Sequence, residues 1–571
     1  MNLHAIYHIP EVPYCYGTSK NTIYLKLRTA NEDLKKVNLY YKEKYAWKTG
    51  FTKKEMNLEA QTELFKFFGT LIDVSEGKAK YFFSVEDKNG LEIFFSERGV
   101  SKNKPDELGN FHKPYVHESE IYKPVTWAKD SIVYQIFPER FCNGNKENDP
   151  RDIEKWGSDV KPKSFFGGDL KGITNNLDYI DSLGINLIYL TPIFKSKSNH
   201  KYNIMDYFEI DKSFGTKEEF KELVEKAHSK GIRIVLDAVF NHTGDDFFAF
   251  EELKKDSNSK YKDWYYIDGD SVCQEKINYK TFGERLKYMP KLNMDNKETK
   301  EYFLEVGRYW IREFDIDGWR LDVADEVCHS FWKDFRKAVK DLKEEALIIG
   351  EVMHLGNEFL KGDEFDSTMN YPFREACLDF FAYGNISSRE LIDRIILRKE
   401  GLINSMYKEM LNLLDSHDTA RFLHECKEDK RKLALAEVFK FTSEGVPYIY
   451  YGDEVGLTGG DDPDCRRCMI WEDDKRDIDL LNHYKKLAKI RKENKELIDG
   501  TTEILVSEEK TLVYKRVLGN DSIMVIINNS KDPLELDLGL RGNYKDIYSE
   551  KDIFIDEKLK INEFNFNILK L

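Results

Sequence analysis

Four apolar, strand-like segments of this 571-residue sequence end in carboxylates, histidines or an arginine. In the stretch D-I-D-G-W-R-L-D-V-A-D-E, from Asp315 to Glu326, Arg320 stands two residues before Asp322. In an extended strand both side chains would leave the same face, and a neighbouring guanidinium lowers the pKa of a carboxyl. An ionised carboxylate is the form that acts as a nucleophile, although a structural ion pair at a strand end would have the same pattern.

The other three segments end in D-A-V-F-N-H, G-E-V-M-H and L-D-S-H-D, and their polar residues are Asp237, Asn241, His242, Glu351, His354, His417 and Asp418. Each has a simpler interpretation: Asp237 as a buried structural acid, Glu351 as the partner of an arginine, and Asp418 as a turn residue. If the four strand ends meet, however, the acids repel one another and at least one pKa should rise. A proton donor would then stand beside an ionised nucleophile, which is the equipment for cleaving a glycosidic bond.

The elements that must position these residues alternate between apolar strands and amphipathic helices. We expect strands at Ser131–Pro138, Asn186–Phe194, Arg233–Phe240, Ile316–Val323, Ala346–Val352, Phe365–Tyr371, Met410–Leu414 and Pro447–Tyr451. We expect helices at Leu170–Leu183, Thr216–Lys230, Lys297–Phe314, Glu326–Leu342, Phe373–Tyr383, Ser388–Arg398, Lys430–Ser443 and Ile478–Lys492. This order predicts parallel strands with crossover helices, as in a (β/α)8 barrel, whose active face lies at the carboxyl ends of its strands.

The regions around the barrel have a different character. Residues 1–124 contain short aromatic and β-branched strands separated by polar turns, which predicts an N-terminal β-sandwich. The barrel would occupy residues 125–240 and 291–498, interrupted by an irregular segment at 241–290 that is too long for an ordinary loop and is interpreted as a small inserted domain. Short strands return in residues 499–571, which predicts a C-terminal β-sandwich.

Composition narrows the function classes. Hydrophobic residues make up 41% of the chain and charged residues 33%, with a net charge of −15. A nucleic-acid partner is not expected, because phosphate contacts need a basic face. There is neither a membrane-spanning apolar stretch nor a secretory leader, so we expect a cytoplasmic protein. The eight cysteines are expected to be thiols, including Cys465 and Cys468 of the single C-x-x-C.

The four motifs, in this order, resemble the signature regions of the alpha-amylase family of glycoside hydrolases. Y-Q-I-F-P-E-R-F at Tyr134–Phe141, M-P-K-L-N at Met289–Asn293 and D-P-D-C-R-R at Asp462–Arg467 are similar to the neopullulanase, cyclomaltodextrinase and maltogenic amylase subgroup. The resemblance covers nearly the whole chain. It implies a retaining mechanism, in which the two catalytic carboxyls lie about 5–5.5 Å apart.

The resemblance also implies roles for individual residues. Asp322 would be the nucleophile, Glu351 the general acid/base and Asp418 the stabiliser of the transition state. The residues that would bind the sugar are Tyr202, His242, Arg320, His417, Asp462 and Arg466. The chain departs from the subgroup at Met353, Asp325, Asn203 and Cys468, where Trp, Asn, Asp and Pro are usual. These departures leave the catalytic acids intact and concern acceptor-side contacts and linkage preference.

A metal site is predicted in the segments N-G-N-K-E-N-D and G-G-D. Alternating side-chain oxygens and a glycine carbonyl suit a hard cation such as calcium, although Asn and Gly also favour a plain polar turn. The resemblance supports Ca²⁺ bound by Asn143, Asn145, Asn148, Asp149, the Gly167 carbonyl and Asp169.

Together these features predict a retaining enzyme that hydrolyses α-1,4 and some α-1,6 bonds of cyclodextrins, maltooligosaccharides and pullulan, with transglycosylation. The resemblance implies a homodimer. The alternatives are an oligosaccharide glucosidase specific for α-1,6 bonds and a catalytically silent sugar-binding protein on the same fold. The intact trio of Asp322, Glu351 and Asp418 argues against the silent protein, because a binding module does not need it.

Overall fold

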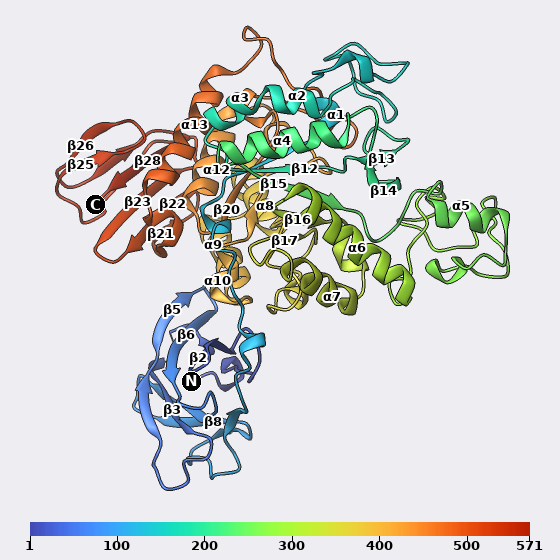
Figure 1. Cartoon of the computed structure of the whole chain (residues 1–571). Coiled ribbons are helices and arrows are strands. Elements are labelled where there is room, and N and C mark those ends of the chain that lie inside the picture. The colour runs from blue at the N-terminus through green and yellow to red at the C-terminus, as the bar shows by residue number, and fades with distance from the viewer. Residues whose placement is uncertain (33) are drawn as a thin grey trace. The chain divides into compact units, whose positions relative to one another are not determined.

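The structure, a computed structural model of the chain, describes residues 1–32 and 34–571 and divides into two compact units (Figure 1). The first comprises Met1–Pro124, Asn357–Asp363 and Arg389–Tyr407. The second comprises Val125–Gly356, Glu364–Ser388 and Lys408–Leu571. The boundaries of the four predicted domains within this division stay a prediction.

The first unit contains the predicted N-terminal β-sandwich. Its antiparallel sheets have the strand orders β1-β2-β6-β5 and β4-β3-β7-β8-β9, with β10 beside β7. The strands are β1 (Cys15–Ser19), β2 (Thr22–Ala30), β3 (Leu34–Glu43), β4 (Thr52–Glu55), β5 (Asn57–Gln61), β6 (Phe65–Asp73), β7 (Ala79–Asp87), β8 (Glu92–Ser96), β9 (Gly99–Ser101) and β10 (Phe111–Lys113). Alternate apolar residues of both sheets, among them Leu25, Val37 and Phe83, form one core. The unit also includes η7 (Asn357–Phe359), α9 (Ser388–Glu400), apart from its first residue, and α10 (Asn404–Tyr407).

The second unit is built on the predicted barrel. Its eight parallel strands have the order β18-β17-β16-β15-β12-β11-β20-β19, and a parallel bridge from Met369 to Leu411 joins the two ends. The strands are β11 (Val133–Ile136), β12 (Leu187–Leu190), β15 (Arg233–Ala238), β16 (Gly318–Leu321), β17 (Leu347–Gly350), β18 (Ser367–Thr368), β19 (Leu411–Asn412) and β20 (Val446–Tyr450). Nearly every residue of these strands is buried, as expected for strands covered on both faces. Their inward side chains, such as Val133, Tyr189 and Ile349, fill the barrel.

Helices connect the barrel strands or, as α13 and α14, follow the last of them (Figure 1). They are α1 (Pro138–Phe141), α2 (Leu170–Asn175), α3 (Leu177–Ser182), α4 (Lys217–Ser229), α6 (Lys297–Phe314), α7 (His329–Lys340), α8 (Tyr371–Cys377), α11 (Phe422–Glu425), α12 (Lys430–Thr442), α13 (Ile478–Glu493) and α14 (Glu496–Asp499). Two predicted helices differ from expectation. Residues 170–183 form two helices, because the Asn176 side chain donates to the Gly172 carbonyl and ends the first. Residues 373–383 begin as α8 and continue as a π-helix at Leu378–Tyr383.

Two insertions extend the loops at the carboxyl ends of the barrel strands. A hairpin of β13 (Phe194–Ser196) and β14 (Ile204–Ile210) follows β12. The segment from 241 to 290 follows β15 and contains α5 (Phe248–Lys255), η5 (Lys262–Trp264) and bridges between Ile267 and Tyr279 and between Thr281 and Pro290. The predicted inserted domain is therefore present as a largely irregular element.

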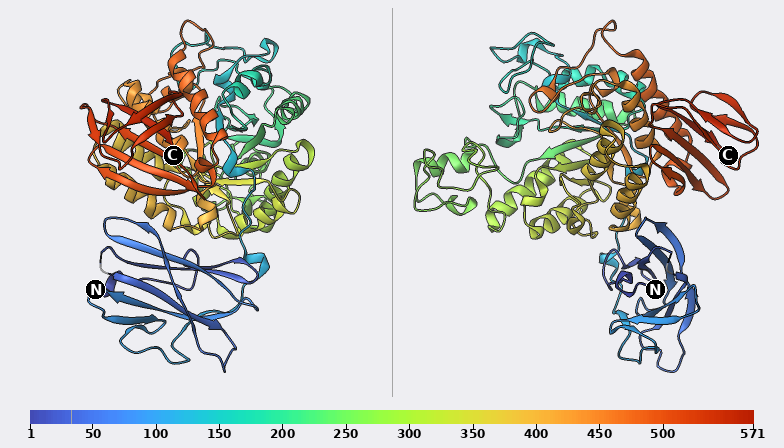
Figure 2. Two further views of the ribbon diagram at one scale, coloured as in Figure 1. Left: turned by 90° about the vertical axis from the view of Figure 1, so that its left-hand side faces the viewer. Right: turned by 180° about the vertical axis from the view of Figure 1, so that it is seen from behind.

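The C-terminal residues form the second predicted β-sandwich, drawn in red in Figure 2. One sheet has the order β21-β22-β23-β28-β25-β26 and the other pairs β24 with β27. The strands are β21 (Thr501–Glu508), β22 (Thr511–Leu518), β23 (Asp521–Asn528), β24 (Leu534–Leu536), β25 (Gly542–Asp546), β26 (Lys551–Ile555), β27 (Leu559–Ile561) and β28 (Asn565–Lys570). The sequence did not predict β25, β26 and β27, which are short and partly exposed.

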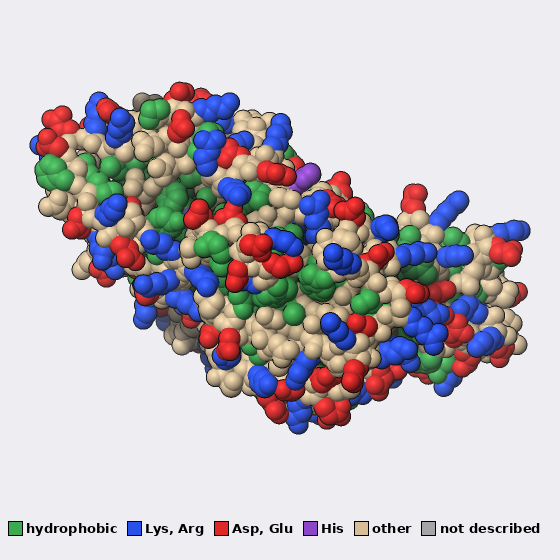
Figure 3. All heavy atoms as spheres, turned by 90° about the horizontal axis from the view of Figure 1, so that it is seen from above, with side chains coloured by type: hydrophobic (Ala, Val, Ile, Leu, Met, Phe, Trp, Pro, Cys, Tyr) green, Lys and Arg blue, Asp and Glu red, His purple; other side chains and the backbone are tan. Residues whose placement is uncertain are grey.

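Acidic and basic side chains intermingle on the face drawn in Figure 3. Among the residues that the structure describes, no helix combines the length and apolar character needed to cross a membrane.

Candidate active site

One buried guanidinium organises the centre of the site. The barrel register places Asp237 of β15 beside Arg320 of β16. Arg320 Nη1 lies 2.8 Å from Asp237 Oδ2 and 2.9 Å from Asp322 Oδ1, and Nη2 contacts Glu351 Oε1. Arg320 is 1% exposed, so its charge balances these carboxylates away from water. The predicted pairing of Arg320 with Asp322 is thus present, and it extends to two further acids.

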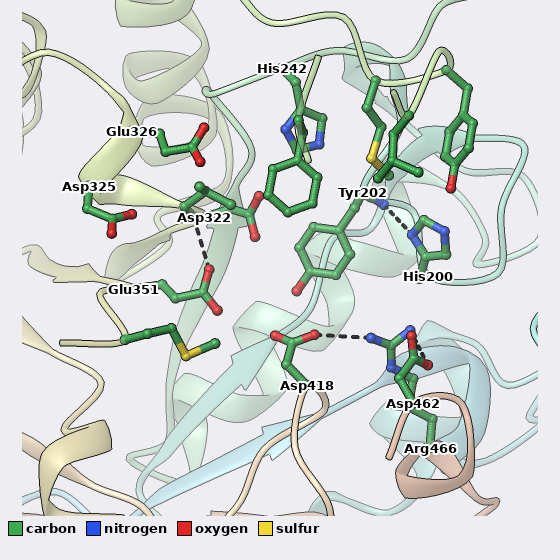
Figure 4. Close-up of a pocket in the computed structure, with 16 residues that line it drawn as sticks. His200, Tyr202, His242, Asp322, Asp325, Glu326, Glu351, Asp418, Asp462 and Arg466 are labelled. Carbon is green, nitrogen blue, oxygen red and sulfur yellow. Dashed lines mark hydrogen bonds and ion pairs between the residues drawn. The ribbon is translucent and has the colours of Figure 1, made fainter. Parts of the chain in front are cut away.

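The three predicted catalytic acids line one cavity of about 480 Å³ (Figure 4). Seven of the nine predicted catalytic and sugar-binding residues line it, namely Tyr202, His242, Asp322, Glu351, Asp418, Asp462 and Arg466. The other two, Arg320 and His417, are buried behind this lining and contact it. Asp322 and Glu351 therefore face the same space, as cleavage of one bond between them requires.

Backbone conformation at Val323 links the two central acids. Val323 has φ 45°, a left-handed conformation that β-branched residues rarely adopt. It turns the Val323 N–H toward Glu351, and the distance from this nitrogen to Glu351 Oε2 is 3.0 Å. This contact could not be predicted from the sequence, because valine after a strand does not ordinarily indicate a turn. Such strain, about 1–3 kcal/mol, persists where the surroundings enforce it and is common at functional sites.

Arg466 positions the third acid. Its Nε donates to the His417 carbonyl at 2.8 Å, Nη2 lies 3.1 Å from Asp418 Oδ1, and Nη1 lies 3.0 Å from Asp462. The Cys465 thiol also contacts the His417 carbonyl at 3.2 Å. All eight cysteines are free in the described chain, which confirms the expectation of thiols. The loop from 462 to 468 therefore fixes the loop that carries Asp418.

Tyr202 and His417 lie side by side next to Asp237. Their rings are parallel, with centroids 5.4 Å apart. The Tyr202 hydroxyl contacts His417 Nε2 and donates to Asp237 Oδ2 at 3.0 Å. Asp237 also accepts from Tyr189 at 2.6 Å and lies behind the cavity lining, in agreement with its interpretation as a buried structural acid.

Burial and charge shift the pKa values of the three acids in different directions. Burial raises the pKa of Asp322 well above its usual range, and Glu351 and Asp237 add to this rise while Arg320 opposes it. Burial and the charge of Asp418 raise the pKa of Glu351 to about 7. Burial opposes ionisation of Asp418 as well, but His417 and Arg466 outweigh it and lower the pKa of Asp418.

These directions correct one expectation from the sequence. Arg320 does favour the ionised form of Asp322, as predicted, but burial is the larger effect and the net shift of its pKa is upward. The sequence shows the neighbouring arginine and does not show the burial. Asp322 and Glu351 share Arg320, so their protons belong to the pair, and the pair keeps a proton into the neutral range.

The histidines of the site stay neutral. Burial lowers the pKa of His417, His242 and His200 to about 3. His242 stacks on Phe282, with ring centroids 5.0 Å apart. His200 also lines the cavity, although no motif in the sequence distinguishes it. Neutral imidazoles donate or accept hydrogen bonds with sugar hydroxyls without adding charge.

The inserted segment supplies part of the cavity lining. Phe282, Leu286, Tyr288 and Met289 line it there, and Val323 and Met353 line it elsewhere. Two residues that depart from the subgroup are therefore in place to contact a substrate: Met353 and Asp325. Asp325 Oδ2 lies 3.3 Å from His354 Nε2.

The predicted cation ligands make hydrogen bonds in two groups. Asn143 Nδ2 donates to Asp149 Oδ1 at 2.7 Å. Gly167 lies so close to the same oxygen that a side chain at this position would collide with it. Asp169 accepts from the backbone of Gly144, Asn145 and Gly172. The side-chain oxygens of Asn143 and Asn148 are buried and have no hydrogen-bond partner within residues 1–32 and 34–571. Buried oxygens without donors fit a hard cation.

Comparison with known proteins agrees with this geometry. The family model for the alpha amylase catalytic domain matches residues 135–500, and the model for the alpha amylase N-terminal ig-like domain matches residues 1–117. A cyclomaltodextrinase from Thermoanaerobacter pseudethanolicus is 45% identical over 96% of both chains. Neopullulanase 2 from Thermoactinomyces vulgaris is 42% identical over 93% of this chain and 91% of its own. A solved cyclomaltodextrinase structure superposes with a TM-score of 0.94 at 38% identity over 100% of both chains.

The match to the alpha amylase catalytic domain, on a (β/α)8 barrel with carboxylates grouped at its strand ends, defines an enzyme of the glycoside hydrolase class. Within that class, this chain belongs to the alpha-amylase family, with its similarity concentrated on the cyclomaltodextrinase, maltogenic amylase and neopullulanase subgroup.

Proposed function

We propose that this enzyme is a retaining α-glucan hydrolase that cleaves α-1,4 and some α-1,6 glucosidic bonds of cyclodextrins, maltooligosaccharides and pullulan, with transglycosylation. The observation that carries the proposal is the presence of Asp322, Glu351 and Asp418 in one cavity at the carboxyl ends of barrel strands. The names of the similar proteins, cyclomaltodextrinase and neopullulanase, support the choice of substrates.

In the first half-reaction, an Asp322 oxygen bonds to the anomeric carbon as the bond from that carbon to the leaving oxygen breaks. Glu351 gives its proton to the leaving oxygen. In the second half-reaction, Glu351 takes a proton from water while the water oxygen displaces Asp322 from the sugar. A sugar hydroxyl in place of water gives transglycosylation. The retained proton of the Asp322–Glu351 pair supports this scheme, and its assignment to Glu351 comes from the family resemblance.

Asp418 would stabilise the positive charge that develops on the sugar. Its ionisation is favoured by His417 and by Arg466, 3.1 Å away. Tyr202 would stack on the sugar ring, and His242, Arg320, His417, Asp462 and Arg466 would bind and orient it. Arg320 and His417 are almost fully buried behind the cavity lining. They would therefore orient the sugar mainly by holding the catalytic acids in place.

We also propose that the chain binds Ca²⁺ through Asn143, Asn145, Asn148, Asp149, the Gly167 carbonyl and Asp169. The unsatisfied oxygens of Asn143 and Asn148 among the described residues support it. A cation there would supply charge that ties the loop after β11 to the start of α2. Only two carboxylates contribute, so we expect weak binding.

A homodimer and a cytoplasmic location complete the proposal. The family resemblance supports the homodimer. Analytical ultracentrifugation at micromolar concentration should show a species of twice the chain mass of 67.2 kDa. A single monomeric species would reject the dimer and leave the catalytic proposal untouched.

The central experiment follows the anomer of the first product by proton NMR during hydrolysis of maltotriose and of a cyclodextrin. A retaining enzyme releases the α-anomer first, and early release of the β-anomer would reject the mechanism. Rates on panose and isomaltose against maltotriose test the linkage. Cleavage of the α-1,6 substrates alone would favour the specific glucosidase, and no sugar release at all would favour a silent binding protein.

A further inference from the structure

Gln135, in the first barrel strand, is the residue that carries a further inference. It lies in β11, is fully buried, and places its Nε2 2.7 Å from His417 Nδ1. The role inferred for Gln135 rests on the proposed function, because it acts through the roles proposed for His417 and Asp418. It depends on which of the two ring nitrogens of His417, Nδ1 or Nε2, carries the hydrogen.

That second nitrogen, Nε2, faces two acceptors. Asp418 Oδ2 lies 3.0 Å from it, and an ionised carboxylate only accepts hydrogen bonds. The Tyr202 hydroxyl also contacts Nε2, but its single hydrogen is directed at Asp237 Oδ2, 3.0 Å away. Asp237 is paired with Arg320 at 2.8 Å, so it too acts as an acceptor. Both neighbours of Nε2 therefore require the ring hydrogen to be on that nitrogen.

A neutral imidazole has one ring hydrogen. With this hydrogen on Nε2, Nδ1 must accept, and the group facing Nδ1 must be a donor. The amide nitrogen of Gln135 meets this requirement. We propose that Gln135 is a positioning residue that fixes the tautomer of His417, so that the Nε2–H of His417 is held toward Asp418 in the reaction.

The surroundings of His417 keep the ring neutral. Only a neutral imidazole has a choice of tautomer, because the imidazolium carries a hydrogen on both nitrogens. Asp418 favours the imidazolium, whereas Arg466, Arg320 and His200 disfavour it, and burial lowers the pKa of His417 to about 3. The ring also lies near Phe137, at a centroid distance of 6.4 Å. Gln135 adds a donor on the Nδ1 side, where a proton would have to bind to make the cation.

A packing role alone does not account for an amide at this position. Gln135 Oε1 is buried and has no hydrogen-bond partner within the part of the chain that the structure describes. Burying an amide without full compensation is unfavourable, and methionine would fill similar space without that cost. The donor facing His417 is what the glutamine supplies and methionine would not.

The test compares Gln135→Met, which removes the donor, with Gln135→Glu, which replaces it with an acceptor. For Gln135→Met we expect kcat on maltotriose to fall about 10-fold to 100-fold at every pH, with KM changed about threefold at most, because the lost orientation acts in the transition state. In Gln135→Glu the carboxylate takes the hydrogen of neutral His417 to Nδ1, and only protonation restores Nε2–H. Its rate optimum should therefore move to lower pH than that of the wild-type enzyme.

Two controls separate this role from a structural one. In a His417→Asn background, Gln135→Met should change kcat less than about twofold, because the residue acts through His417. Tyr134→Phe removes a buried hydrogen bond of the same strand, from Tyr134 to Glu454 at 2.8 Å. It should leave kcat within about twofold of wild type and the pH of the rate optimum unchanged. Thermal unfolding of each variant checks that it is folded.

Equal kcat in Gln135→Met and wild type, or additive losses with His417→Asn, would overturn the inference. So would a folded Gln135→Glu variant with the wild-type pH profile. These outcomes differ from failure of the proposed function, in which the wild-type enzyme itself would release no sugar from maltotriose.

Discussion

The floor and the wall of the cavity are built on different principles. The floor consists of Asp322, Glu351 and Asp418, which line the cavity at the carboxyl ends of barrel strands, together with Arg320 and His417, which are buried directly behind them. The wall consists of Phe282, Leu286, Tyr288 and Met289 from the inserted segment. It is apolar or aromatic, and Tyr288 is 40% exposed.

The difference shows how one fold can separate rate from selectivity. Arg320 touches three carboxylates and Asp418 touches His417, so a change in one of these groups alters its neighbours. The wall residues carry no charge, and backbone hydrogen bonds from Phe282 to Met289 and from Met289 to Leu286 hold them in place. We therefore expect substitutions in the floor to act on kcat and substitutions in the wall to act on KM.

Asp322→Ala should give the largest effect. Removing the nucleophile should lower kcat on maltotriose by about 10⁴-fold or more, with little change in the folded structure, because the substitution also removes a buried acid that repels Glu351 and Asp237. Initial rates and thermal unfolding measured on the same preparation test this. A folded variant with wild-type turnover would remove Asp322 from the mechanism. Asp325→Ala, at an acid of the same cavity outside the proposed trio, is the matched control and should retain kcat within about tenfold.

Glu351→Gln should have a smaller effect that depends on the leaving group. Loss of the proton donor should lower kcat/KM by about 10²–10⁴-fold on maltotriose and much less on aryl glycosides whose leaving group needs no protonation. In wild type the rate should fall as pH rises through about 7, because burial and Asp418 raise the pKa of Glu351 to about 7 and the acid form is required. The glutamine variant should lack this basic limb on the activated substrate. Equal losses on both substrates would assign Glu351 another role.

The sequence predicted the floor well, for a physical reason. Asp322, Glu351 and Asp418 follow apolar segments of the kind expected for buried parallel strands, and parallel strands in a barrel bring their carboxyl ends to one face. The two-residue spacing of Arg320 and Asp322 in the sequence predicted that their side chains are neighbours, and the two do form an ion pair. The eight strands and the two sandwiches followed from the same periodicity.

What the sequence could not provide depends on contacts between distant residues. Nothing local predicts that Val323 adopts φ 45° and donates its N–H to Glu351. The net rise in the pKa of Asp322 comes from burial, which a neighbouring arginine does not reveal. The wall was predicted only as an irregular insertion, because its residues have no periodicity that would place Phe282 against His242.

Tyr288→Ala tests the wall and should have a moderate effect. Losing a half-exposed aromatic surface for the sugar should raise KM about 3-fold to 10-fold, since a stacking contact contributes about 0.5–1.5 kcal/mol, while kcat stays within about twofold. Steady-state kinetics on maltotriose and a cyclodextrin measure both constants. Tyr266→Ala, also in the inserted segment but outside the cavity lining, is the control. A tenfold fall in kcat for Tyr288→Ala would end the separation between floor and wall.

Removal of Ca²⁺ should have the smallest effect on catalysis. It extends the comparison from the floor and the wall to a third region, the proposed calcium-binding loop. The proposed cation ligands lie after β11 and before α2, in residues 143–169, and belong to neither the floor nor the wall. A ligand at a concentration of about 100 times its dissociation constant raises the free energy of unfolding by about 2.7 kcal/mol. Chelation of Ca²⁺ should therefore lower the melting temperature by a few degrees. At 25 °C, kcat and KM should stay within about twofold, because no catalytic group is a ligand. Asp149→Asn should reproduce the chelated melting temperature and make it insensitive to added calcium. A chelator that left the wild-type melting temperature unchanged would reject the calcium site, whereas a large loss of kcat at an unchanged melting temperature would mean that this loop acts on the floor after all.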